Sequence, residues 1–310
     1  MRARVLSGRK IADEIIAEVA AEVADLREIH GFSPRLDVIR VGEDPASEVY
    51  VGNKVKMAAE VGIESRLHHL PAETTTDELL ALVTELSNND IVDGILVQLP
   101  LPDQIDERAV LEAVAADKDV DGFHPLNVGR LNLGHKALVP CTPAGVIEIL
   151  KRSNIEIAGK HAVIVGRSNI VGKPMAALLL RENATVTICH SRTADLAAIT
   201  RSAEILVAAI GRPAYIKAEH IGEGSTVIDV GINPFVDLNA VASTFPDEDV
   251  EKRLAAIEKR GSTLIGDVNQ RDAMAKAANF TPVPGGVGLL TVAMLMKNTV
   301  DAAKTRRLNG

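Results

Sequence analysis

The fold of this chain is indicated most directly by the segment Val163-Ile164-Val165-Gly166-Arg167-Ser168-Asn169-Ile170-Val171-Gly172-Lys173-Pro174. A short apolar run breaks there at a glycine-bounded turn, and a proline then stands in the first turn of a helix, where it sacrifices no hydrogen bond. Backbone N–H groups and the positive end of a helix dipole suit an anion. The segment therefore predicts a strand, turn and helix that bind a nucleotide phosphate. Its spacing is neither G-x-G-x-x-G nor a Walker A loop, so an ordinary strand-to-helix turn remains an alternative.

The strand expected after that helix ends without an acidic residue. Residues 185–189 have the pattern of a strand, and His190, Ser191 and Arg192 follow it. A dinucleotide fold that prefers NAD usually has a carboxylate there, which holds the ribose 2′-hydroxyl. Without one, and with Ser191, Arg192 and Arg167 able to donate to a 2′-phosphate, NADP is the predicted cofactor. Arg192 could instead be a solvated surface charge.

Length and composition predict a two-domain enzyme. The chain has 310 residues, more than one hydrophobic core usually supports. A net charge of -8 argues against nucleic-acid binding, and no apolar run is long enough to span a membrane. The N-terminus leads into an amphipathic helix without the features of a signal peptide. The two cysteines, Cys141 and Cys189, predict reduced thiols in a cytoplasmic protein.

Helix and strand patterns alternate along the chain, which is typical of an α/β fold. We expect helices at residues 8–30, 45–61, 76–86 and 142–150, and strands near 36–41, 94–98, 161–165, 185–189, 204–209, 225–230 and 263–266. A last apolar helix begins after Gly288 and should pack on the first domain. These elements predict an N-terminal α/β catalytic domain (residues 1–140 and 285–310) and a Rossmann-like NADP-binding domain (residues 141–284).

The first domain contains a candidate proton-transfer group. Tyr50 and Lys54 are four residues apart on one expected helix, so their side chains should reach the same surface. Burial in a cleft between the domains can lower the pKa of a lysine by several units from about 10.4, which would suit it to act as a general acid or base. Gln98, at the end of an apolar strand, could hydrogen-bond the ammonium group. A surface Tyr/Lys pair is the alternative.

Asp121 is the second candidate in this domain. It lies in the loop Lys118-Asp119-Val120-Asp121-Gly122-Phe123-His124-Pro125. A carboxylate there could accept two N–H bonds from a planar, amidine-like heterocycle, although a turn cap would need the same residue. His68 and His69 alternate on an expected strand, so they cannot both bind one metal ion, and no metal site is predicted.

Together these residues resemble the bifunctional methylenetetrahydrofolate dehydrogenase/methenyltetrahydrofolate cyclohydrolases over nearly the whole chain. The matching segments are residues 50–54, 94–102, 119–123, 166–168, 171–174, 266–268 and 281–288. The resemblance implies NADP-dependent oxidation of 5,10-methylenetetrahydrofolate to 5,10-methenyltetrahydrofolate, and hydrolysis of that product to 10-formyltetrahydrofolate. These reactions belong to the one-carbon metabolism that supplies purine biosynthesis. The resemblance also implies a homodimer formed through the nucleotide-binding domains.

The resemblance assigns roles to the folate-side residues. In the family, the residue matching Lys54 transfers the proton of the hydrolytic step, and the one matching Gln98 supports that lysine. The residue matching Tyr50 packs on the folate and orients it, and the one matching Asp121 anchors the pterin. The chain departs from the family at Leu289-Leu290, where members generally have Pro-Met, which puts folate affinity and the balance of the two activities in question.

The resemblance likewise assigns cofactor contacts. The nicotinamide and the ribose phosphates are expected on Gly166, Arg167 and Ser168, the 2′-phosphate near Ser191, and a backbone contact around Ile232. Arg192 is added on its charge alone. Two other functions stay open, namely a different NADP-linked dehydrogenase, such as the shikimate type, and a catalytically silent NADP-binding protein. Loss of activity on folates would favour the first, whereas a binding module would not need a tuned lysine.

Overall fold

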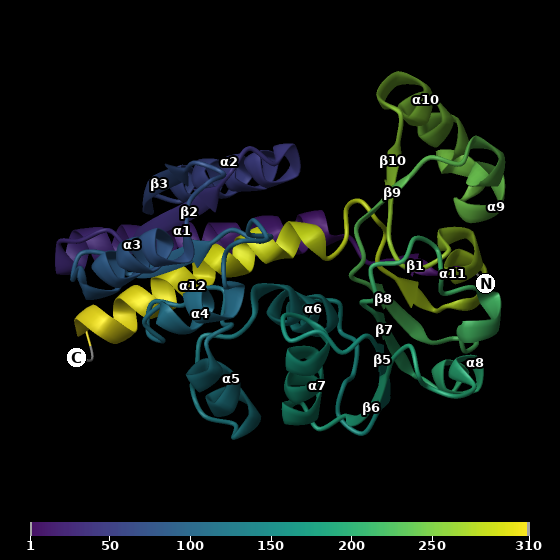
Figure 1. The fold of residues 1–310 in the computed structure, drawn as a ribbon. Helices are drawn as coiled ribbons and strands as arrows, with labels where there is room; N and C mark the ends of the chain where they lie inside the picture. The colour runs from purple at the N-terminus through teal and green to yellow at the C-terminus, as the bar shows by residue number, and fades with distance from the viewer. Residues whose placement is uncertain (1, 309–310) are drawn as a thin grey trace. The chain divides into compact units, whose positions relative to one another are not determined.

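The computed structural model describes residues 2–308, which divide into two compact units (Figure 1). The small-sheet unit contains residues 12–141 and the C-terminal residues from Val292 onward. The large-sheet unit contains the residues up to Ile11 and residues 142–291. The predicted domains were 1–140 with 285–310, and 141–284, so the two divisions differ near both chain ends. At the N-terminus the reason is strand pairing, because β1 (Arg4–Val5) runs parallel to β11 (Asn279–Phe280).

The small-sheet unit is built on three parallel strands, β2 (Arg35–Val41), β3 (Glu64–Leu70) and β4 (Gly94–Val97), in the order β3-β2-β4. Its helices are α1 (Gly8–His30, which starts in the other unit), α2 (Pro45–Glu60), α3 (Thr76–Asn88), α4 (Glu107–Ala113), α5 (Pro125–Asn132) and most of α12 (Gly288–Leu308). Six of the seven residues of the central strand β2 are buried, as expected for a parallel strand covered on both faces.

Helix α2 begins where the sequence predicts. Asp44 is its N-cap, and the carboxylate accepts the backbone N–H of Ser47 at 2.7 Å. Such a cap satisfies one of the N–H groups that the first helical turn leaves without a partner. The predicted helix at 45–61 is thereby confirmed to within one residue. Its start matters because it fixes where Tyr50 and Lys54 stand.

Helix α12 returns to the small-sheet unit, as predicted. Near its end, Arg306 and Arg307 donate to the fully buried carboxylate of Asp93, at 3.0 Å from Arg306 Nη1 and 2.7 Å from Arg307 Nη2. Asp93 immediately precedes β4, so these bonds fasten the C-terminal helix to the start of that strand. Buried charges are ordinarily paired in this way.

The large-sheet unit contains a six-stranded parallel sheet in the order β1-β11-β8-β7-β5-β6. Its longer strands are β5 (His161–Val165), β6 (Thr185–Cys189), β7 (Ile205–Ala208) and β8 (Thr226–Asp229). Figure 1 shows α6 (Cys141–Arg152) and α7 (Gly172–Arg181) on one face, and α8 (Leu196–Arg201) and α11 (Gln270–Lys276) on the other. The chain order reverses on the two sides of β5, and ligands of open α/β sheets bind at the carboxyl ends of strands at such a point.

One predicted strand has a different place from the others. The strand expected near 263–266 is β10 (Thr263–Ile265), which pairs antiparallel with β9 (Asn233–Phe235) in a separate two-stranded sheet. Between these strands the chain forms α9 (Val241–Thr244) and α10 (Val250–Arg260). Among residues 2–308, no helix combines the length and the apolarity needed to cross a bilayer.

Candidate functional site

Lys54 and Gln98 lie together at the carboxyl end of β4. The ammonium Nζ of Lys54 donates to Gln98 Oε1 at 2.9 Å. The amide Nε2 of Gln98 donates to the carbonyl of Leu99 at 2.6 Å, which fixes the amide with its oxygen toward the lysine. Lys54 is half-buried, and Tyr50, one turn earlier on α2, is 44% exposed. Three of the four predicted residues therefore share one region of the small-sheet unit.

Asp121 stands in a loop whose backbone is held from several sides. The buried carboxylate of Asp119 accepts the N–H of His124 at 2.8 Å. The amide of Asn298, on α12, donates to the carbonyl of Val120 at 2.8 Å. Gly122 has a positive φ of 74°, and a Cβ there would lie 2.5 Å from a backbone carbon, so only glycine fits. These constraints fix the position of Asp121 without using its side chain.

The carboxylate of Asp121 is available to a ligand. Among residues 2–308 it accepts no hydrogen bond, and it is half-buried. Burial raises its pKa to about 6, the negative charge of Asp119 adds to the rise, and the positive charge of Lys54 opposes it. The same charges act on Cys141, where burial first and then Asp121 raise the pKa of the thiol well above its usual value. Cys141 is therefore a neutral thiol at neutral pH, and Asp121 and Lys54 lie within electrostatic reach of each other.

The turn after β5 requires glycine at both ends. Gly166 has a φ of 133°, and a Cβ there would lie 2.1 Å from the carbonyl oxygen of Ala209. A Cβ on Gly172 would lie 2.3 Å from the carbonyl oxygen of Gly166. The N–H of Gly166 also donates to the backbone carbonyl of Cys189 at 2.9 Å, which connects this turn to the end of β6. Three backbone segments therefore come close together at the motif of residues 163–174.

The turn offers backbone donors to an anion, although in a different way from the prediction. Ser168 Oγ accepts the N–H groups of Val171 and Gly172, at 3.1 and 3.2 Å, and so caps the first turn of α7. The N–H groups of residues 167–170 have no acceptor in the described chain, and Arg167 is exposed beside them. Consecutive free amides next to a guanidinium suit a phosphate. This arrangement fits the phosphates of a dinucleotide.

The tight turn after β6 exposes two further donors. The backbone N–H of His190 donates to Thr193 Oγ1 at 2.8 Å, and the backbone carbonyl of His190 accepts the N–H of Thr193 at 2.9 Å. Ser191 and Arg192 are exposed at the tip of this turn. The next acidic residue, Asp195, is occupied as the N-cap of α8. A hydroxyl and a guanidinium without a competing carboxylate fit the 2′-phosphate of NADP.

Two buried acids support this edge of the large sheet, and no sequence motif identified them as structural. Asp267 accepts the N–H groups of residues 210–212 at 2.6 to 3.0 Å, and the amide of Asn233 at 3.0 Å. Asp229 accepts the N–H of Asp267 at 2.8 Å, and burial raises its pKa well above the usual value. Together they hold the loops after β7 and β8, where Ile232 is 44% exposed. For Asp229 the available signal was an acid at the end of an apolar strand, because it is the last residue of β8.

His68 and His69, which stand next to each other on β3, each have a hydrogen-bonding partner within the small-sheet unit. His68 Nε2 lies 2.7 Å from the buried carboxylate of Asp37, and His69 Nε2 lies 3.1 Å from the carbonyl of Gly42. The described residues contain no group of three or more His, Cys, Asp or Glu side chains that could hold a metal ion. The two histidines therefore have separate structural partners.

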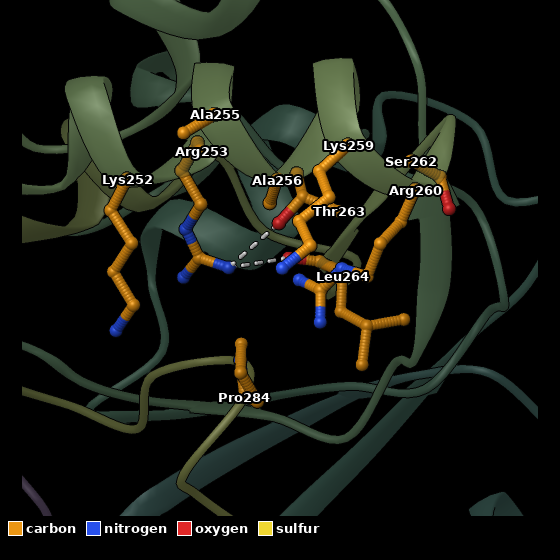
Figure 2. Close-up of a pocket in the computed structure, with 10 residues that line it drawn as sticks. All are labelled: Lys252, Arg253, Ala255, Ala256, Lys259, Arg260, Ser262, Thr263, Leu264 and Pro284. Atoms are coloured by element: carbon orange, nitrogen blue, oxygen red, sulfur yellow. Dashed lines mark hydrogen bonds between the residues drawn. The ribbon is translucent and has the colours of Figure 1, made fainter.

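Two cavities of the large-sheet unit have walls that contain none of the predicted site residues. One, of about 440 Å³, opens near Lys160, Glu204 and Thr226. The other, of about 530 Å³, lies between α10, β10 and Pro284 (Figure 2). No sequence motif pointed to either cavity.

Two family models match the chain. Residues 6–121 match the catalytic domain of tetrahydrofolate dehydrogenase/cyclohydrolase, and residues 140–307 match the NAD(P)-binding domain. This chain belongs to the tetrahydrofolate dehydrogenase/cyclohydrolase family. Relatives in this family include the bifunctional protein FolD of Koribacter versatilis, 55% identical over 100% of this chain and 99% of the relative. The bifunctional protein FolD of Moorella thermoacetica is 52% identical over 98% of this chain and 100% of its own.

Solved structures of the tetrahydrofolate dehydrogenase/cyclohydrolase family have the same fold. The bifunctional enzyme FolD of Campylobacter jejuni matches with a TM-score of 0.88 and 43% identity, over 98% of this chain and 99% of that one. The FolD of Trypanosoma brucei, solved with NADP cofactor and inhibitor, matches with a TM-score of 0.87 and 40% identity, over 98% of each chain. The predicted family, and the α/β fold with a catalytic and a Rossmann-like NAD(P)-binding domain, are confirmed.

Proposed function

We propose that this chain is an NADP-dependent methylenetetrahydrofolate dehydrogenase that also acts as a methenyltetrahydrofolate cyclohydrolase. The observation that carries the proposal is the Lys54–Gln98 hydrogen bond at 2.9 Å, within electrostatic reach of the available carboxylate of Asp121. Family membership supports both activities. The enzyme oxidises 5,10-methylenetetrahydrofolate to the methenyl form and hydrolyses that to 10-formyltetrahydrofolate, in one-carbon metabolism.

The folate-side residues have distinct roles in this proposal. Lys54 moves the proton while water adds to the methenyl carbon and the five-membered ring opens. Gln98 holds the ammonium group in one position, because its own amide is fixed by the carbonyl of Leu99. Asp121 accepts N–H bonds from the pterin, for which its carboxylate has no competing donor in the described chain. Tyr50 offers an exposed ring on which the folate packs.

The cofactor-side residues bind NADP at the carboxyl ends of the large sheet. When bound, NADP supplies the acceptor for the hydride that leaves the one-carbon bridge. The free amides of residues 167–170 and the exposed Arg167 support phosphate binding there. The residues that hold the cofactor in this proposal are Gly166, Arg167, Ser168, Ser191, Arg192 and Ile232.

A coupled assay tests the proposed function. Purified protein is mixed with 5,10-methylenetetrahydrofolate and either NADP or NAD, and the absorbance of reduced cofactor and of the methenyl product is followed. We expect NADP reduction with a methenyl signal that rises and then decays faster than in buffer. Stable methenyl product would contradict the cyclohydrolase, and absence of reduction with both cofactors would contradict the dehydrogenase.

Folate binding should weaken at acidic pH because the pKa of Asp121 is about 6. This pKa lies above the usual value, so the carboxylate becomes protonated as the pH falls from 7 to 5 and loses its charge and acceptor capacity. With about one tenth of the groups ionised at pH 5, the KM for methylenetetrahydrofolate should rise about tenfold. Initial rates at saturating NADP measure this change. In Asp121→Asn the KM should be high and flat between pH 5 and 7, and a flat wild-type KM would contradict the role.

Arg167→Ala and Ser191→Ala should each weaken NADP more than NAD. Both side chains are exposed donors beside the expected phosphate positions, and loss of a charge-assisted bond to the 2′-phosphate should raise the Kd for NADP at least about tenfold. Titration calorimetry with both cofactors measures the difference. Arg181→Ala, at the far end of α7, is the control and should change neither Kd. Equal losses for NADP and NAD would refute the assignment.

Two further features belong to this proposal. The chain forms a homodimer through its nucleotide-binding unit, which the family resemblance supports, and light scattering should then give twice the chain mass of 33.0 kDa. A mass of one chain would contradict it. The enzyme acts in the cytoplasm, in support of which Cys141 and Cys189 are buried free thiols.

A further inference from the structure

A basic cavity lies in the large-sheet unit, apart from the residues proposed to bind folate and NADP. It has a volume of about 530 Å³ and is lined by α10, β10 and Pro284. Four of its lining residues are basic, namely Lys252, Arg253, Lys259 and Arg260. Figure 2 shows these side chains extending from α10 toward the gap, with Pro284 on the other side. The chain as a whole has a net charge of -8, so this local excess of positive charge is not a result of composition.

The helix segregates its charges by a sequence repeat. The triplet Glu-Lys-Arg occurs at residues 251–253 and again at 258–260, seven residues later. Residues seven apart lie on the same face of a helix, so Lys252 lies near Lys259 and Arg253 lies near Arg260, and all four line the cavity. Glu251 and Glu258 are not among the lining residues. The part of the cavity wall that α10 forms therefore contains its basic residues and not its acidic ones.

Arg253 is a buried cation in this wall. It is 6% exposed, and its guanidinium donates to Thr263 Oγ1 at 3.2 Å and to the carbonyls of Leu264 and Val283 at 3.1 and 3.2 Å. It also lies 4.6 Å over the ring of Phe245. Its Nε has no hydrogen-bond partner among residues 2–308. All of its hydrogen-bond acceptors are therefore neutral, and buried charges are ordinarily paired.

The remaining cations also lack paired acids. Lys252, Lys259 and Arg260 are exposed, and no ion pair in the described chain includes them. Burial lowers the pKa of Arg253, and the charge of Asp249 only partly opposes this effect. The cavity therefore has several positive charges, one of them buried, and no carboxylate among its lining residues.

We propose that this cavity binds a small multivalent anion that carries at least two phosphate or carboxylate groups. A volume of about 530 Å³ is within the range of small-molecule sites and exceeds what a single phosphate ion would fill. The exposed Lys252, Lys259 and Arg260 contact the anionic groups, and Arg253 supplies fixed positive charge behind them. Ala256, Leu264 and Pro284 form the apolar part of the wall, which suits the linker between two charged groups.

Calorimetry on the full chain tests this site with two probes, tripolyphosphate and tri-γ-glutamate. Each titration is done with saturating NADP, so that the proposed cofactor site does not take up the probe. The test variant is Lys259→Gln/Arg260→Gln, whose two side chains are exposed. The control is Arg181→Gln/Lys217→Gln, which removes the same charge from exposed positions of the large-sheet unit outside the cavity wall.

We expect one bound probe per chain in the wild type and the control, with equal Kd, and at least tenfold weaker binding in the test variant. Binding of tripolyphosphate alone identifies a phosphate ligand, and binding of tri-γ-glutamate alone identifies a carboxylate ligand. Binding of neither probe, or equal Kd in test variant and wild type, would overturn the proposal. The NADP Kd and the thermal midpoint of each variant verify its fold, and Lys252→Gln replaces the double variant if that one fails to fold. Because no folate turnover is measured, the result is independent of the proposed function.

Discussion

Lys54→Ala should lower the kcat of methenyltetrahydrofolate hydrolysis by about a thousandfold and leave the Kd for NADP unchanged. General acid–base groups contribute roughly 10² to 10⁴ in rate, and Lys54 is the ammonium group that Gln98 holds at 2.9 Å near Asp121. The measurement starts from methenyltetrahydrofolate and follows its decay above the buffer rate. NADP binding is measured separately by calorimetry.

The same helix provides a matched control. Lys56 is two residues further along α2, its side chain is 77% exposed, and its Nζ lies 3.8 Å from Glu60. Lys56→Ala removes an equal charge from the helix without touching the Gln98 hydrogen bond, and it should hydrolyse the methenyl substrate at the wild-type rate. A Lys54→Ala enzyme as fast as Lys56→Ala would refute the proton-transfer role.

The second large effect concerns stability. Asp93→Ala should lower the free energy of unfolding of the small-sheet unit by roughly 3 to 5 kcal/mol. The substitution leaves the guanidinium groups of Arg306 and Arg307, which are 12% and 24% exposed, without their buried carboxylate. It also removes the acceptor of the Arg35 N–H at 3.0 Å. Urea denaturation followed by circular dichroism measures the change.

Asp103→Ala is the control for this stability prediction. Asp103 is exposed in a turn of the same unit, so its removal should change the free energy of unfolding by no more than about 0.5 kcal/mol. An Asp93→Ala protein with the urea midpoint of Asp103→Ala would show that the buried ion cluster does not hold α12 in place.

Local patterns in the sequence were sufficient for most helices and strands. Gly8–His30 shows the periodicity of an amphipathic helix over its whole length. Asp44 is the N-cap of α2, a position that aspartate favours. Pairing between strands was not predictable in the same way. β1 and β11 have two residues each, too few for a periodic pattern, and they meet across more than 270 positions of the chain. β10 has a normal strand pattern, but the pattern does not say that β9 is its partner.

The candidate site divides along the same line. The spacing of Tyr50 and Lys54 on one helix was enough to predict a common surface. The position of Asp121 in a loop was enough to make it a candidate for binding a heterocycle. Asp267 was not predictable as a structural acid, because its role depends on N–H groups more than 50 positions away in the sequence. The basic face of α10 has the pattern of an ordinary solvated helix surface until β10 and Pro284 are placed opposite it. The roles of the ten predicted site residues stay predictions until the variants are measured.

Residues 142–291 of the large-sheet unit interrupt the small-sheet unit in sequence, which has a consequence for synthesis on the ribosome. Residues 12–141 leave the ribosome before residues 142–291, but Asn298, which donates to the carbonyls of Val120 and Val139, is made more than 150 residues later. At about 5 to 20 residues per second, that delay lasts roughly 10 to 30 seconds. During this interval the loop of Asp121 lacks the hydrogen bonds from Asn298. Residues 12–141 are translated before most of the large-sheet unit, yet they complete their native contacts only after that unit has been translated.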